Sequence, residues 1–192
     1  MWILKEPWGV KTPSGKISGG DWSFTTHFND NNSWKDEDMW KVIIQINYAI
    51  HHNLGWSQLD FIDGNHKMIE ELKNMAYINL SKIPAEPTSP ASHLKDCYPI
   101  WREIVLEQIR IYEPDLIIFG YTFPYFGTDF LITSKSVHTQ SGKYYTDIYC
   151  ENKLIDQDKS IILDKEVILV DAYHPSRKGG ENGSRDYVTS IV

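Results

Sequence analysis

Residues 114–121 read Pro-Asp-Leu-Ile-Ile-Phe-Gly-Tyr, and this stretch decides the fold class. Pro114 ends the segment before it, the apolar run 115–119 follows, and Gly120 closes the run. A continuous apolar run of this length, without alternation, is typical of a strand buried on both faces in a parallel sheet. Residues 167–171 form a second such run, closed by Ala-Tyr-His-Pro. We therefore predict two buried parallel strands.

Helical and strand-like patterns surround these two runs. Apolar residues at helical spacing predict helices at 36–54, 66–74, 94–112 and 184–192. Strand patterns are found at 1–6 and 75–80, with weaker ones at 144–150 and 160–163. Residues 10–33, rich in Gly, Ser, Thr and Asn, are expected to form a long loop of functional importance.

Strands that alternate with helices indicate a parallel sheet covered by helices on both faces. The four stronger strand patterns therefore predict an α/β fold, a three-layer sandwich with a central, mainly parallel four-stranded sheet. A chain of 192 residues with 41% hydrophobic residues suits a single domain, residues 1–192.

Composition limits the class of protein. No apolar run approaches the roughly 20 residues of a membrane helix, and no signal peptide is evident, so we expect a soluble, cytoplasmic protein without membrane contact. Cys97 and Cys150 are too few for a metal cluster, and we expect two buried free thiols and no cofactor or metal. The formal charge of −7 argues mildly against nucleic acid, although a local basic face on an acidic body is compatible with DNA binding.

Polar residues follow each predicted parallel strand. In open α/β sheets, ligands bind beyond the carboxyl ends of the strands. This rule places Glu6, Asn79, Gly120–Tyr121 and His174 with Ser176 around one crevice. The alternative is that these polar residues only cap the helices that follow.

Four short motifs resemble the uracil-DNA glycosylase superfamily, in the same order along the chain. Glu6-Pro7-Trp8 stands where that family has its first motif, Asp-Pro-Tyr or a relative, and Tyr77-Ile78-Asn79-Leu80 is similar to the strand whose Asn reads the base. The third is the succession Lys82-Ile83-Pro84, Cys97 and 114–120, which resembles the iron-sulfur branch without the partner cysteines of its cluster. His174-Pro175-Ser176 is similar to the last motif, His-Pro-Ser.

The resemblance implies a uracil-DNA glycosylase-like fold and a monofunctional DNA glycosylase that acts in base excision repair. It implies that Asn79 binds a flipped-out base, with Phe24 in the place of the stacking Phe. Two departures bear on specificity: Glu6 replaces Asp or Asn, and Trp8 occupies a position on the pocket wall.

The chemistry assigns roles to two of these residues. Hydrolysis of an N-glycosidic bond places positive charge on the sugar and negative charge on the leaving base. We expect Glu6 to orient the water and stabilise the sugar, and His174 to hydrogen-bond the base. Contacts with DNA are expected from Ser81, Ser176, Arg177, Lys178 and Arg185, in a protein that acts as a monomer.

Three alternatives remain open at this point. One is an anti-phage glycosylase that removes hypermodified bases, such as glucosylated hydroxymethylcytosine, through a roomier pocket. Another is a metal-dependent nuclease or phosphatase in which Glu6, Asp129 and Asp171 bind Mg²⁺. The last is a non-catalytic nucleic-acid or nucleotide-binding module.

Overall fold

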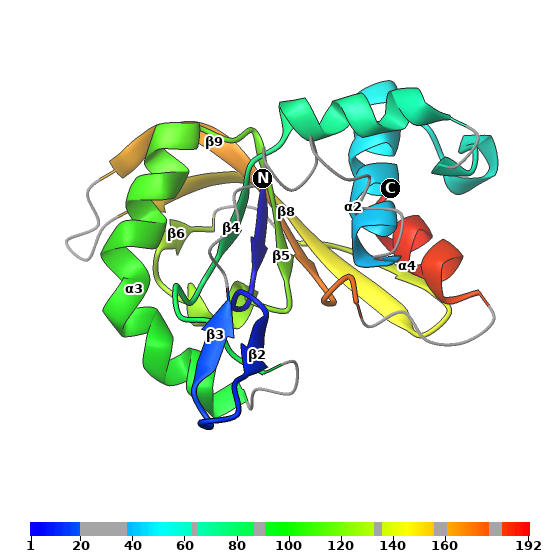
Figure 1. Ribbon diagram of the computed structural model, residues 1–192. Helices are drawn as coiled ribbons and strands as arrows, with labels where there is room; N and C mark the ends of the chain where they lie inside the picture. The colour runs from blue at the N-terminus through cyan, green and yellow to red at the C-terminus, as the bar shows by residue number, and fades with distance from the viewer. Residues whose placement is uncertain (20–37, 63–64, 87–90, 133–135, 156–160, 177–181) are drawn as a thin grey trace.

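A computed structural model describes residues 1–19, 38–62, 65–86, 91–132, 136–155, 161–176 and 182–192 (Figure 1). The α-helices in these ranges are α2 (Asp38–His52), α3 (Ala91–Tyr112) and α4 (Gly183–Ile191), and the 3-10 helices are η2 (Trp56–Gln58), η4 (His66–Asn74) and η5 (Phe123–Tyr125). The strands are β1 (Trp2–Leu4), β2 (Gly9–Lys11), β3 (Ile17–Gly19), β4 (Tyr77–Asn79), β5 (Leu116–Gly120), β6 (Phe130–Leu131), β7 (Val137–Ser141), β8 (Tyr144–Ile155) and β9 (Ile161–Ala172).

The main sheet is mixed, with a parallel half and an antiparallel half. Strands β4, β1, β5 and β9 lie side by side in this order, and all their pairings are parallel. Beyond β9 the sheet continues with β8, which pairs antiparallel with β9, β6 and β7. The predicted parallel arrangement of these four strands is confirmed, but the prediction of a four-stranded sheet is wrong, because the sheet has seven strands among the described residues.

Helices cover both faces of the sheet, as predicted. On one face α2, η4 and α4 bury a core around Trp2, Leu4, Trp40 and Tyr187. On the other face α3 packs with η5 over a core that contains Ile3, Phe119 and Leu169. Figure 1 shows α3 on one side of the strands and α2 with α4 on the other. Successive residues of β1 enter different cores because side chains alternate across a strand.

Several elements differ from the sequence-based predictions. The patterns at 160–163 and 167–171 belong to one strand of twelve residues, β9. The pattern at 144–150 is the first part of β8, which runs to Ile155. Residues 9–19 form the β2–β3 hairpin rather than an irregular loop, and the predicted helix at 66–74 is a 3-10 helix.

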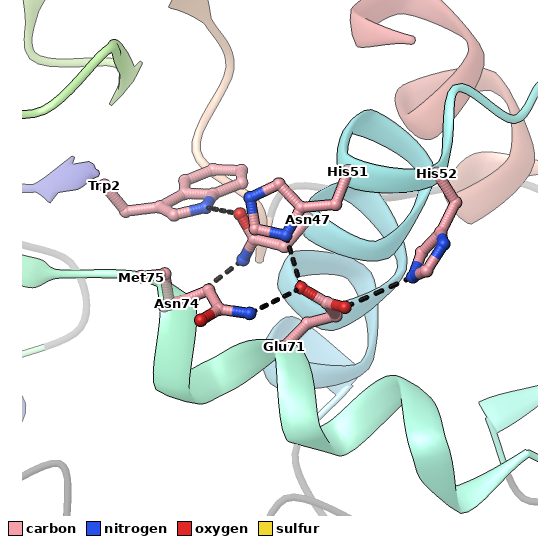
Figure 2. A network of polar contacts seen from close by, with 7 residues as sticks. All are labelled: Trp2, Asn47, His51, His52, Glu71, Asn74 and Met75. Carbon is pink, nitrogen blue, oxygen red and sulfur yellow. Dashed lines mark hydrogen bonds and ion pairs between the residues drawn. The ribbon is translucent and has the colours of Figure 1, made fainter.

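A network of polar contacts joins α2 to η4 at the amino ends of the strands (Figure 2). Both oxygens of the Glu71 carboxylate are bound, one by His51 and Asn74 and the other by His52, at 3.2 Å from Nε2. Beside them the Trp2 indole donates to Asn47, which donates to the sulfur of Met75. Burial opposes ionisation of Glu71, but the hydrogen bonds from His51, Asn74 and His52 outweigh it and lower its pKa. This network fixes where the chain enters β1 and β4.

The two cysteines are free thiols. Cys97 is buried, and its sulfur lies 3.5 Å from Nε2 of His93, one turn earlier in α3. Cys150 is exposed, so the prediction of two buried thiols is wrong for this one. In the described ranges, no helix has the length and apolar character needed to cross a membrane.

Candidate active site at the carboxyl edge of the parallel strands

The carboxyl ends of the four parallel strands form one row. Leu4 of β1 aligns with Asn79 of β4, and Gly120 of β5 aligns with Ala172 of β9. Ile3 of β1 aligns with Phe119 of β5, which puts Leu4 beside Gly120. The last residues of all four strands therefore lie side by side. Glu6 and His174 each stand two residues beyond this row in the chain. Because neighbouring strands lie about 4.8 Å apart, β1 and β9 are about 10 Å apart, with β5 between them.

Gly120 allows the segments that carry Glu6 and His174 to approach closely. A Cβ at this position would lie 2.3 Å from Cδ2 of Leu4, 3.2 Å from Cδ of Pro175 and 3.7 Å from Cα of His174. A real side chain does not fit in this space. The structure therefore brings the Glu6 and His174 segments to the two sides of one residue.

Glu6 is half-buried, and its Oε2 has almost no contact with solvent. Tyr125 of η5 is an electrostatic neighbour: burial, followed by Tyr121 and Glu6, raises the pKa of the Tyr125 hydroxyl. Glu6 and Tyr125 are thus electrostatic neighbours at the edge of the sheet.

His174 is half-buried and is held by Ser176. The Ser176 backbone N–H donates to Nδ1 at 3.3 Å, and the Ser176 hydroxyl lies 2.7 Å from the same atom. An Nδ1 that accepts a backbone N–H carries no proton, so the proton of the neutral ring is on Nε2. The loop therefore presents a hydrogen-bond donor at Nε2.

Asn79 is half-buried and oriented from two sides. Its Oδ1 accepts a hydrogen bond from the Tyr77 hydroxyl at 3.0 Å. Its backbone carbonyl accepts from Nζ of Lys82 at 2.5 Å, and the same ammonium donates to Gln108 of α3 at 2.6 Å. Burial lowers the pKa of Lys82 to about 8. The end of β4 is thereby tied to α3.

Trp8 and Ser81 lie on the β4 side of β1, away from β5. Trp8 pairs with Ala85 through the backbone, and its side chain is 65% exposed. Ser81 has no exposed surface, and its hydroxyl donates to the Ile83 carbonyl and accepts from the Ile83 N–H. The Ser81 hydroxyl is enclosed, so the structure does not support the predicted contact between Ser81 and a DNA phosphate.

The remaining predicted DNA contacts are dispersed. Ser176 is exposed on the His174 segment, and Arg185 is exposed on α4. The Tyr187 hydroxyl of α4 donates to the Tyr173 carbonyl at 2.5 Å, which links this helix to the His174 segment. Phe24, Arg177 and Lys178 lie outside the described residues.

Three residues near the site have no role in the predicted glycosylase reaction. The strand-end rule predicts Tyr121 at the crevice without a function, and Tyr125 carries no sequence signal because only folding brings it near Glu6. Asp171 enters the predictions only as a metal ligand of the nuclease alternative. Burial, followed by Asp147 on the neighbouring strand, raises the pKa of Asp171 to about 6.

The magnesium site proposed as an alternative does not form around Asp129. This carboxylate is buried, and it binds Arg102 through Nε at 2.8 Å and Nη2 at 2.5 Å, as well as the Tyr98 hydroxyl. Among the residues that the structure describes, no group of three or more His, Cys, Asp or Glu side chains is arranged to hold a metal ion. Asp129 therefore has a structural role.

A groove of about 810 Å³ lies beside this edge and not within it. The β2–β3 hairpin residues 15–19, residues 83–86 and His93 line this groove. Glu6, Asn79 and His174 do not contribute to it. The convergence of polar groups, and not this groove, nominates the site.

Compared with known protein families, curated proteins and solved structures, the chain matches none.

Proposed function

We propose that the protein is a DNA glycosylase that hydrolyses the N-glycosidic bond of a uracil-like or modified base, flipped out of the DNA. Water adds to C1′ of the sugar while the bond from C1′ to the base nitrogen breaks. The base leaves with the electron pair and takes up one proton, and the added water loses one, so that the products are the free base and the abasic sugar. An enzyme for this reaction needs an anion near the sugar and a donor near the base. Glu6 and His174 supply these two groups.

The observation that carries the proposal is the position of these two groups. Both stand two residues beyond one aligned row of strand ends, on strands that lie about 10 Å apart with β5 between them. In the proposed complex, the sugar of the nucleoside faces the carboxylate and its base faces the imidazole. A Glu6 on the other edge of the sheet would have ended the hypothesis.

The contacts at Nδ1 of His174 support a role as a donor. With Nδ1 accepting from the Ser176 N–H, a neutral ring carries its proton on Nε2, which donates in the proposed reaction to a base oxygen that gains negative charge. The charge on the base develops only during bond cleavage. The hydrogen bond therefore strengthens in the transition state, where it accelerates the reaction.

Asn79 supports recognition of the base. A carboxamide presents a donor and an acceptor together, as reading of a Watson-Crick edge requires. Tyr77 binds Oδ1 and so orients the amide group, and the tyrosine ring lies 5.1 Å from the Trp40 ring in the core. A rigid amide selects one edge better than a mobile one.

The architecture is compatible with a uracil-DNA glycosylase-like three-layer sandwich. Four parallel strands between two helical layers support it. The antiparallel extension of β8, β6 and β7 adds a part that the resemblance does not imply.

The decisive experiment is an excision assay on oligonucleotides that contain uracil, hypoxanthine or glucosylated hydroxymethylcytosine. Wild type, Glu6→Gln and His174→Ala are compared in EDTA, with Glu103→Gln as a control because Glu103 is 82% exposed on α3. We expect base release by wild type and the control, and at least a hundredfold loss in the other two, typical of general acid-base and electrostatic groups.

The same panel separates the alternatives. Release of only the glucosylated base favours a defence enzyme, and strand breaks that require Mg²⁺ favour a nuclease. Binding of the oligonucleotides without release of any base by wild type would refute the proposal and leave a binding module.

A further inference from the structure

Tyr121 has a backbone conformation that its side chain opposes. Its φ is +64°, in the left-handed region that a residue with a Cβ rarely occupies. Two hydrogen bonds hold it there, from its N–H to the carbonyls of Phe119 at 3.0 Å and Ala172 at 2.8 Å. Both bonds use the backbone alone, so a glycine would form them without strain.

Burial of the Tyr121 ring offsets little of the free energy that this backbone conformation costs. Its side chain is 41% exposed, whereas Phe119 and Phe126 on either side of it in the chain are fully buried. Strained non-glycine residues of this kind persist where the surrounding structure enforces them, and they concentrate at functional sites.

Tyr121 follows β5, the strand that lies between the strands leading to Glu6 and His174. Tyr121 follows Gly120, which contacts the ends of both neighbouring strands. Nζ of Lys5 lies 4.9 Å from the ring centroid, on the Glu6 side. Both Tyr121 and Glu6 act electrostatically on Tyr125, so the three residues are close together.

We infer that Tyr121 is a specificity-determining residue whose ring stacks against a planar heteroaromatic base held between Glu6 and His174. This inference rests on the proposed function and deepens it. An aromatic ring stacks on any nucleobase, because every base has a π-face. In this arrangement Tyr121 favours any planar base, and Asn79 distinguishes bases by their Watson-Crick edge. Lys5 holds the ring from one side through a cation–π contact.

The test uses oligonucleotides with 2-aminopurine at the target position, whose fluorescence is quenched when the base stacks on an aromatic ring. Tyr121→Phe keeps a stacking surface, Tyr121→Leu keeps apolar bulk, and Tyr121→Gly relieves the backbone. We expect wild type and Tyr121→Phe to quench, and the other two variants to bind about tenfold or more weakly without quenching. Tyr112→Leu is the matched control, because Tyr112 is an exposed tyrosine at the end of α3.

Stability separates a functional ring from a structural one. We expect Tyr121→Gly to unfold at the same temperature as wild type or a higher one, because the strain is removed. Lower stability of Tyr121→Gly, or wild-type quenching by Tyr121→Leu, overturns the inference.

Failure of the inference and failure of the proposed function give different results. If wild type quenches 2-aminopurine but releases no base from any substrate, the stacking role stands and the glycosylase proposal fails. If wild type releases a base and Tyr121→Gly does so at the same rate and KM, the glycosylase proposal stands and the role of Tyr121 fails.

Discussion

The fold places the Asp171 carboxylate where its ionised form is disfavoured. It is partly buried near the end of β9 and pairs across the ladder with Asp147 of β8. Burial and this second acid raise its pKa to about 6, and both acids also act on Tyr149, whose ring stacks on Phe123 at 5.1 Å. The two acids therefore face each other on adjacent strands.

We expect the free energy of unfolding to fall as the pH rises from about 4 to above 6. In this window Asp171 keeps its proton in the folded state but has lost it in the unfolded state, so raising the pH favours unfolding. After allowance for solvent screening, the loss is about 1–2 kcal/mol. Urea denaturation at several pH values measures it, and Asp171→Asn should flatten the slope, whereas Asp96→Asn on the exposed side of α3 should not.

A second prediction concerns the buried ion pair of Asp129 and Arg102. Asp129→Ala leaves Arg102 and the Tyr98 hydroxyl without their acceptor, which costs about 3–5 kcal/mol. Glu103→Gln removes only the exposed contact of Arg102 and should change the stability by less than about 0.5 kcal/mol. Equal effects of the two substitutions in chemical denaturation would contradict the assignment of Asp129 to the core.

At the scale of elements, apolar periodicity predicted the helices that became α2, α3 and α4, and the runs that became β1 and β5. The same signal failed where strands face solvent. Most of β7 is exposed and its sequence is Val-His-Thr-Gln-Ser, so it has no apolar pattern. In β9, the charged residues 164–166 interrupt the apolar residues. The apolar pattern therefore predicts two separate strands where the structure has one.

For the candidate site too, the sequence predicts some features and not others. The strand-end rule predicts Glu6, Asn79 and His174 at one edge of the sheet, and the carboxyl ends of β1, β4 and β9 are aligned there, while the roles of the three residues stay predictions. The contribution of Tyr125 and the charge repulsion between Asp147 and Asp171 depend on contacts between distant elements. No local pattern in a single sequence encodes such contacts.

The packing of β5 against its neighbours gives a prediction at this scale. Gly120→Ala forces apart Leu4 and Pro175, and we expect a loss of about 1–3 kcal/mol in stability together with reduced base release. Gly127→Ala is the control, since a Cβ there meets no atom within 4 Å. Thermal unfolding of both variants compares them, and a Gly120→Ala protein as stable as the control would disprove the close approach.

For the whole molecule, the formal charge of −7 implies that the proposed binding of DNA depends on a few local cations. We expect Arg177→Glu with Lys178→Glu to weaken DNA binding and to reduce the slope of log Kd against log salt by about 2, close to 0.9 for each lost phosphate contact. Lys67→Glu with Lys73→Glu on η4 makes the same change of charge on exposed residues near the amino ends of the strands. The same slope for both double variants would exclude a specific role for Arg177 and Lys178.

The pairing of β1 has a consequence for how the chain reaches its native state. This strand comes from residues 2–4, yet its partners are residues 77–79 and 118–119. The antiparallel strands β7, β8 and β9, in contrast, pair residues within one continuous stretch. During synthesis, β1 cannot complete its pairing until more than half of the polypeptide has been made. Strands β7, β8 and β9 can pair as soon as their own stretch of chain has been made. Pulsed hydrogen exchange during refolding should therefore protect the amides of β8 before those of β1, because nearby segments meet sooner than distant ones.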